Sequence, residues 1–124
     1  MTGCTPTAAA AGDAGALQVI ERIGGPALVR TMLTAFLRDA PRRIAAAQDA
    51  LRAGNIAGAQ AAAHAMKSSA GQLGARGVQA LSTQIEHSSD APAMAGWIEE
   101  VRLELERYVV WLGDRAPRAT EGKS

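Results

Sequence analysis

The sequence predicts an all-α protein: an antiparallel four-helix bundle with a short additional helix at its N-terminal end. Apolar residues recur every three to four positions over long stretches, which is the period of one face of an α-helix. Alanine is abundant and only 3% of the 124 residues are aromatic, a composition that favours helix because alanine loses little side-chain entropy. Amphipathic helices joined by short loops pack most simply as an antiparallel bundle.

Charge and cysteine content limit the possible function classes. The net charge is +1 with both signs interspersed, so nothing favours binding to nucleic acid, which calls for a concentrated basic patch. The single cysteine, Cys4, excludes an intrachain disulfide and fits a reducing compartment. No run of about 18 apolar residues and no secretory signal is present, so we expect no membrane insertion and a cytoplasmic location.

The first half of the chain predicts a tail, a short helix and a long helix. Residues 1–12 lack an amphipathic period and are expected to be flexible. A short helix is predicted over Asp13–Ile23, and Gly24-Gly25-Pro26 then ends it and begins a long helix. Pro41 lies in the middle of that helix, where we expect a bend because the apolar stripe keeps its phase. The stripe consists of Val29, Leu33, Phe36, Ala40, Ile44, Ala47 and Leu51.

Three further helices are predicted in the second half. Gly54 and Asn55 suit the end of the long helix and the N-cap of the next. That next helix covers Ile56–Leu73, and Gly74 is expected to close it in the left-handed conformation. The remaining elements are a helix from Arg76 to about His87, a loop over residues 88–92, a helix from near Ala93 to Gly113, and a disordered tail over residues 115–124. The bundle domain is therefore expected over residues 13–114.

One face of the Ile56–Leu73 helix carries a reactive side chain. At ~100° per residue, the small apolar residues of this helix share the side that suits a core: Ala59, Ala62, Ala63, Met66, Ala70 and Leu73. His64, Lys67, Ser68 and Gly71 lie together on the opposite side. The imidazole of His64 is therefore expected to point into solvent from a rigid helix.

The chemistry of this face suggests phosphoryl transfer. A histidine near its ordinary pKa of ~6.5 is mostly neutral at pH 7, and its free ring nitrogen can attack an electrophilic phosphorus. Lys67, one turn further on, can offset the charge of an attached phosphoryl group. Gly71 costs ~1 kcal/mol relative to alanine inside a helix, and on this face it leaves a shallow spot where another protein could approach His64.

The segment His64–Gly74, HAMKSSAGQLG, resembles the signature of histidine-containing phosphotransfer (HPt) domains, which reads roughly H-x-L-K-G-[small]-[small]-x-x-[apolar]-G. The similarity extends from about Leu17 to Leu112 in the order and length of helices. Two positions depart from the pattern. Met66 replaces the usual leucine, a swap that conserves volume, and Ser68 stands where the family usually has glycine.

The resemblance implies a phosphorelay intermediary. His64 would take a phosphoryl group from the aspartate of a response-regulator receiver domain and pass it to another receiver, the two belonging to a hybrid sensor kinase and a downstream regulator. Such domains are phosphoryl carriers without ATP-dependent kinase activity. They need no cofactor or metal, because Mg²⁺ belongs to the receiver. Lys67 would stabilise the phosphoryl group. The expected receiver-docking residues are Ala57, Gln60, Ala61, Ser68 and Gly71, joined by part of the Val29–Leu51 helix, with Lys67 and Arg76 as complementary cations.

Several alternatives stay open. The family often has Gln or Glu where Glu86 stands, and its carboxylate would then hold the Nδ1–H of His64 and leave Nε2 as the nucleophile; Glu86 can equally be a surface acid. His87 reads as a helix-terminal cation without function. The whole chain could instead be a non-catalytic helical interaction module. A metal- or haem-binding bundle ranks far behind, since two histidines and one cysteine supply too few ligands.

Overall fold

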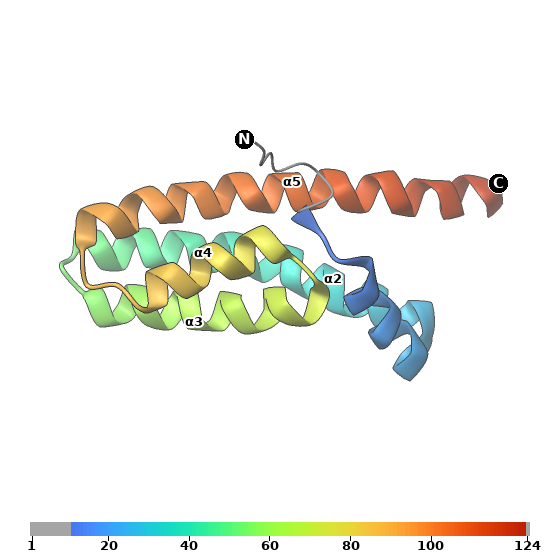
Figure 1. The fold of residues 1–124 in the computed structure, drawn as a ribbon, viewed down its shortest axis with the longest axis horizontal. Coiled ribbons are helices and arrows are strands. Elements are labelled where there is room, and N and C mark those ends of the chain that lie inside the picture. Colours follow the sequence, from blue (N-terminus) through green and yellow to red (C-terminus); the bar gives the residue numbers. More distant parts are fainter. Residues whose placement is uncertain (1–10, 124) are drawn as a thin grey trace, which may run out of the picture.

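The computed structural model describes the backbone of residues 11–123 and the side chains of residues 11–114. Its helices are α2 (Ala14–Arg52), α3 (Ile56–Leu73), α4 (Arg76–Glu86) and α5 (Ala91–Lys123). Successive helices run in opposite directions and pack on one another, and α2 also contacts α5, so the ring of four is closed (Figure 1). The all-α prediction is confirmed. Of the predicted N-terminal tail, residues 1–10 lie outside the described part.

The separate short N-terminal helix is not present as an element of its own. Residues from Ala14 onward form the first part of α2, which bends sharply at Gly25 (Figure 1). Gly25 has φ 77° and ψ −179°, a conformation that glycine adopts without a Cβ penalty. Gly25 is therefore the kink at which two helical parts meet, and α2 denotes both parts together. At Pro41 the backbone stays helical, so α2 continues across this proline.

Asp13 anchors the start of α2 to the turn between α3 and α4. Its carboxylate accepts the N–H of Gly15 at 3.0 Å and caps the helix. Its backbone N–H donates to the carbonyl of Gly74 at 2.9 Å, and Arg76 Nη2 donates to Asp13 Oδ2 at 2.6 Å. Arg76 thus pairs with Asp13 while its side chain stays 61% exposed, and its part in docking a receiver stays a prediction.

The core lies between the apolar sides of the helices. The predicted stripe of α3 is buried except for Ala62, which is half-buried, and the alanines in it let neighbouring helices approach closely. In α4 and α5 the buried side chains are Val78, Ser82, Ile85, Met94, Ile98, Val101, Leu105 and Tyr108, and Leu81, Trp97 and Leu112 are partly buried. The fully buried larger side chains are Tyr108, Met66, Leu73, Ile85, Met94, Ile98, Val78 and Val101.

Tyr108 joins α5 to the end of α3. Its hydroxyl donates to the carbonyl of Leu73 at 2.5 Å, which satisfies a carbonyl that the helix end leaves without a helical partner. Its ring meets Phe36 edge-on at 5.9 Å and stacks on Trp111 at 5.6 Å. Burial raises the pKa of Tyr108 well above its ordinary 10.0, so the hydroxyl remains a donor. These contacts fix the end of α3 at Leu73, near the end of the predicted signature.

α5 is longer than the sequence predicted. It begins at Ala91 and its backbone remains helical to Lys123, ten residues beyond the expected end at Gly113. The expected ending at Gly113 was therefore wrong. Ala, Arg, Glu and Lys in this stretch favour helix but Pro117 and Gly122 disfavour it, so intrinsic propensity alone does not explain the extension. The domain limits, residues 13–114, stay a prediction.

Candidate functional site

His64 lies on the solvent side of α3, opposite the side that enters the core. The helix is held at both ends: the Asn55 side chain accepts the N–H of Gly58 at 2.9 Å, and Gly74 closes the helix with φ 74°. Both caps were predicted and are confirmed. The side chain of His64 is 60% exposed. The structure thus presents the imidazole outward from a helix whose ends are fixed.

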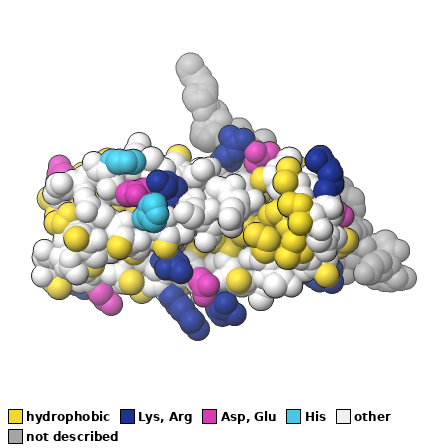
Figure 2. Space-filling model, turned by 90° about the horizontal axis from the view of Figure 1, so that it is seen from below, with side chains coloured by type: hydrophobic (Ala, Val, Ile, Leu, Met, Phe, Trp, Pro, Cys, Tyr) yellow, Lys and Arg dark blue, Asp and Glu magenta, His cyan; other side chains and the backbone are white. Residues whose placement is uncertain are grey.

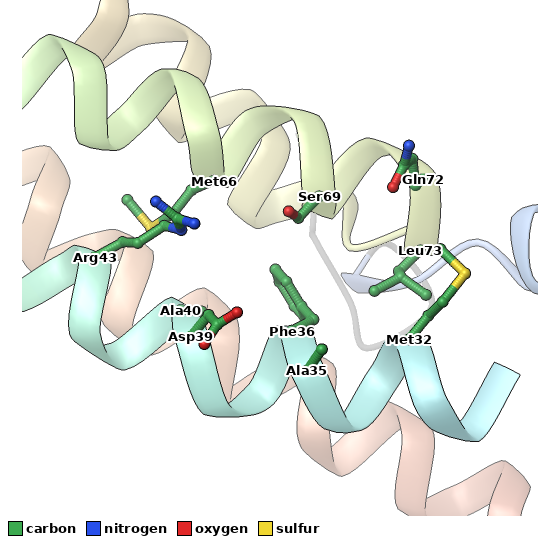
Figure 3. Close-up of a pocket in the computed structure, with 10 residues that line it drawn as sticks. All are labelled: Met32, Ala35, Phe36, Asp39, Ala40, Arg43, Met66, Ser69, Gln72 and Leu73. Carbon is green, nitrogen blue, oxygen red and sulfur yellow. The ribbon is translucent and has the colours of Figure 1, made fainter. Parts of the chain in front are cut away.

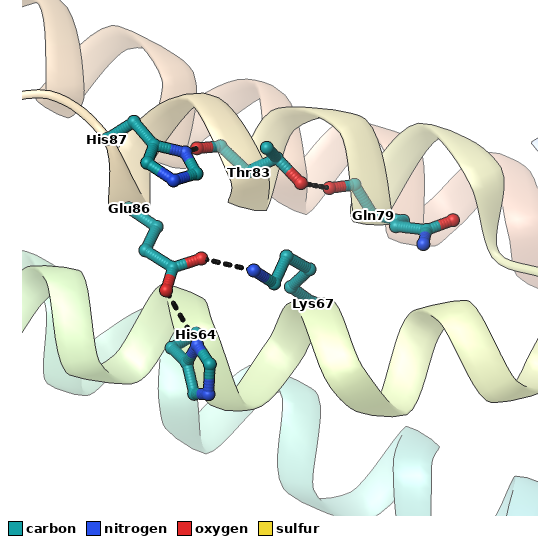
Figure 4. Close-up of polar contacts among 6 residues, drawn as sticks. All are labelled: His64, Lys67, Gln79, Thr83, Glu86 and His87. Carbon is teal, nitrogen blue, oxygen red and sulfur yellow. Dashed lines mark hydrogen bonds and ion pairs between the residues drawn. The ribbon is translucent and has the colours of Figure 1, made fainter.

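Glu86, in the last turn of α4, bridges His64 and Lys67 (Figure 4). Its Oε2 lies 2.6 Å from His64 Nδ1 and its Oε1 lies 2.6 Å from Lys67 Nζ. Hydrogen bonding to Lys67, and next to His64, holds the pKa of the Glu86 carboxyl below its ordinary 4.5. The carboxyl is therefore ionised at neutral pH. We call these three residues the His64 network.

The acceptor at Nδ1 decides which nitrogen of His64 is reactive. An ionised carboxylate can only accept, so the proton of the contact belongs to Nδ1. In the neutral imidazole Nε2 then carries the lone pair, and Figure 4 shows this nitrogen pointing away from Glu86. The network therefore fixes both the tautomer and the direction of the ring. An exposed nitrogen with a free lone pair is suited to nucleophilic attack.

The outer side of α4 lies beside this network (Figure 4). His87 Nδ1 is 3.0 Å from the carbonyl of Thr83, and His87 is exposed on the same face of the molecule as His64 (Figure 2). Gln79 reaches over Gly71, where a Cβ would lie 2.9 Å from Gln79 Nε2. Because this atom is the far end of a flexible side chain that can move aside, the contact does not by itself require glycine, and the role of Gly71 in docking stays a prediction.

The predicted docking residues on α3 differ in accessibility. Ala57, Ala61 and Ser68 are exposed around His64. Gln60 is half-buried, and its Nε2 donates to the carbonyl of Ser88 at 2.8 Å. Gln60 thus holds the loop after α4 against α3, a contact that leaves less of it to meet a partner. Because these exposed side chains are small, they do not cover the imidazole of His64.

The opposite edge of this surface belongs to α2 and carries two arginines that sequence reasoning did not single out. A shallow depression between α2 and α3 is lined by Asp39, Arg42, Arg43, Ala46, Ala61 and Ala62. Next to it, a cavity of about 160 Å³ with Phe36, Met66 and Leu73 among its walls opens between the same helices, and Arg43 and Asp39 lie on its α2 side (Figure 3). The only sequence signal was two adjacent cations in the long helix. Nothing in the sequence placed them level with Ala61.

Two negative findings apply to the part of the chain that the structure describes. No helix there has both the length and the apolar character needed to cross a membrane. His, Cys, Asp and Glu side chains do not gather there in groups of three or more that could hold a metal ion.

Comparison with known proteins identifies the family. The family model described as Hpt domain matches residues 31–111, more than half of the 124 residues. The chain belongs to the Hpt domain family. The match covers most of α2, all of α3 and α4, and α5 as far as Trp111, and so includes the whole His64 network. Hpt domains carry phosphoryl groups on histidine in phosphorelays and interact with receiver domains, typically without being enzymes in their own right. Neither the curated proteins nor the solved structures gave a significant match.

Proposed function

We propose that His64 is the phosphoacceptor of this Hpt domain: it takes a phosphoryl group from the phosphorylated aspartate of one receiver domain and passes it to the aspartate of another. The observation that carries the proposal is the contact between His64 Nδ1 and Glu86, which leaves Nε2 free on an exposed surface. His87 also lies on this face, but a backbone carbonyl, which is uncharged, meets its Nδ1.

The transfer step needs only a lone pair and an activated phosphoryl group. Nε2 attacks the phosphorus, and an N–P bond forms as the bond between phosphorus and the aspartate oxygen breaks. The aspartate leaves as a carboxylate with that electron pair. The proton on Nδ1 stays in its hydrogen bond to Glu86, where the carboxylate stabilises the positive charge that develops on the ring. The reverse sequence delivers the group to the second receiver.

Lys67 can neutralise two anionic groups, the carboxylate of Glu86 and the phosphoryl group on His64. Its ammonium lies on Glu86 in the unphosphorylated chain, and its side chain is only 28% exposed. A phosphoryl group on Nε2 would bring further negative charge to the same surface. The ammonium group of Lys67 then offsets the negative charge of both Glu86 and the phosphoryl group. This supports its predicted phosphoryl-stabilising role.

The partners follow from this chemistry. The donor and the acceptor are receiver domains, one of a hybrid sensor kinase and one of a downstream regulator, in the cytoplasm. The receiver supplies Mg²⁺ and the activated aspartate, while this chain supplies the nucleophile and a docking surface without consuming ATP. That surface comprises Ala57, Gln60, Ala61, Ser68 and Gly71. The hydroxyl of Ser68, which stands near His64 in place of the usual glycine, is a candidate contact for the receiver.

The test is a phosphotransfer screen against the receiver domains of the source organism, each phosphorylated with radiolabelled acetyl phosphate. Wild-type protein should acquire acid-labile phosphate from at least one receiver. His64→Gln should acquire none, because it lacks the nucleophile. His87→Gln is the matched control: it removes an exposed imidazole from the same face and should be labelled like the wild type.

Two outcomes would contradict the proposal. Equal labelling of His64→Gln and wild type would place the phosphate elsewhere. Binding of receivers without any transfer to the wild type would favour the alternative, a helical interaction module in which His64 has no chemical role.

A further inference from the structure

The arginines of the described chain fall into two groups. Carboxylates pair with the guanidinium groups of Arg38, Arg52, Arg76, Arg102 and Arg107. No ion pair joins Arg22, Arg30, Arg42 or Arg43 to a carboxylate among residues 11–114. All four of these side chains are exposed on α2. Their charge is thus available to a partner.

Two of the four lie beside the reactive histidine. Arg42 and Arg43, the arginine pair, line the depression that reaches Ala61, one turn before His64 on α3. Asp39 lies near the arginine pair and next to Arg38. Hydrogen bonding to Arg38 lowers the pKa of Asp39 most, and the charges of Arg42 and Arg43 lower it further. One carboxylate thus faces three guanidinium groups. Figure 2 shows Lys and Arg side chains along the edges of the face that carries both histidines, with acidic side chains among them.

The other cation beside His64 contributes little net charge. Lys67 Nζ lies 2.6 Å from Glu86 Oε1, so the His64 network is close to neutral when the imidazole is neutral. The positive surplus around His64 therefore comes from α2, on the side opposite α4.

We propose that the arginine pair guides a phosphorylated receiver onto His64. The proposal rests on the proposed function and names the charged edge of its docking surface. A receiver that donates a phosphoryl group presents an anionic acyl phosphate on its docking face, and this charge complements two unpaired guanidinium groups. Arginine also binds phosphate and carboxylate oxygens through a planar fork of donors.

The charge on the whole surface supports one direction of approach. α2 carries six arginines and three carboxylates, whereas α5 carries six carboxylates and five basic residues. An anionic surface is therefore drawn toward the α2 side. Exposed charges act mainly on encounter, because they attract a partner before contact and are screened by salt.

The experiment compares a double variant, Arg42→Gln with Arg43→Gln, against wild type, using the receiver that labels the wild type fastest. Rates of transfer are measured by rapid quench over a range of protein concentrations, at about 0.01 M and about 1 M salt. We expect the second-order rate constant to fall roughly tenfold at low salt. At high salt the double variant and the wild type should converge. The first-order rate at saturation should stay close to that of the wild type.

The matched control is Arg22→Gln with Arg30→Gln, which removes the same two charges from exposed, unpaired sites on the same helix. Arg30 is thirteen residues before Arg43, about 20 Å along the helix axis. This variant should slow transfer much less. Equal slowing by both double variants would overturn the proposal, as would a lower saturating rate with unchanged association. If the wild type takes no phosphoryl group from any receiver, the proposed function itself fails.

Discussion

At the residue scale, Glu86 is the residue that contacts both His64 and Lys67. The sequence left it open whether this acid was a surface charge or the partner of His64, because the answer depends on how α4 lies against α3. The structure places its two oxygens on Nδ1 of His64 and on Nζ of Lys67. The contact exists; its contribution to transfer stays a proposal, and it can be measured.

Replacing Glu86 with alanine should release the ring. Without the carboxylate, the imidazole divides between its two neutral tautomers and turns more freely, so fewer molecules present a free Nε2. We expect transfer to His64 to slow by roughly tenfold to a hundredfold, the range typical of partners that orient a histidine. Nitrogen NMR of the imidazole reports the tautomer directly and should show the Nδ1–H form dominant in wild type only.

Glu86→Gln is the conservative comparison. Its amide oxygen still accepts from Nδ1–H, while the charge is lost. It should retain the wild-type tautomer, but transfer should still slow, because the charge that stabilises the developing positive charge on the ring is lost. An alanine variant that transfers as fast as wild type with a mixed tautomer would show that orientation of the ring does not limit the reaction.

At the element scale, the ends of helices could be predicted best from the sequence. Contacts between residues far apart in the sequence could be predicted least. Asn55 and Gly74 follow from local rules for helix caps, and both occupy the predicted positions. The ion pair between Asp13 and Arg76 joins residues 63 positions apart, and no local pattern indicates it. The predicted break at Gly25 is present as a kink inside α2. Gly25 is the residue of α2 that leaves helical geometry.

Gly74→Ala tests how tightly α3 is closed. Gly74 has φ 74°, a conformation that costs an L-residue roughly 1–2 kcal/mol. A Cβ there would also lie 2.6 Å from the carbonyl oxygen of Asp13, which is backbone and yields little. Urea denaturation should therefore show a loss of unfolding free energy larger than this conformational cost alone.

Gly54→Ala separates the cost of the positive φ from the cost of the steric contact with Asp13. Gly54 has φ 76°, but a Cβ there would meet no atom within 4 Å. Its variant should lose only the conformational part, about 1 kcal/mol. Equal losses for the two variants would mean that the start of α2 moves aside freely and that the Asp13 contact is not a firm anchor.

At the scale of the whole molecule, the sequence predicted the set of helices but not their register. The apolar period and the caps determine where helices lie along the chain. They do not say that Arg42 and Arg43 lie level with Ala61, because that depends on how α2 slides against α3. The charged edge of the site could therefore be found only from the structure. The exposed position of His64 could be predicted from the sequence. The length of α5 was missed because its last residues are polar and include Pro117 and Gly122, so local propensity does not indicate that the helix continues.

Acid should destabilise the whole molecule through its paired carboxylates. The pKa values of Asp13, Asp39, Glu86 and Glu99 lie below their ordinary 3.8 or 4.5, chiefly through hydrogen bonds to Arg76, Arg38, Lys67 and Arg102 respectively. The unfolded chain then binds protons at a higher pH than the folded one. The stabilisation is complete above about pH 5 and is lost as the pH falls through the lowered values. Thermal unfolding followed from about pH 6 to 3 should show a falling Tm. A flat profile would contradict these pairings.

The bridge formed by Glu86 also has a dynamic consequence. α4 has 11 residues and is the shortest of the helices that the structure describes, and Glu86 occupies its final turn. Fraying of helix ends is the most frequent local opening in proteins, and here it would detach the carboxylate while α3 stayed folded. On the proposed function, the fraction of molecules ready to react would therefore follow the protection of this helical turn against hydrogen exchange more closely than the global stability of the bundle.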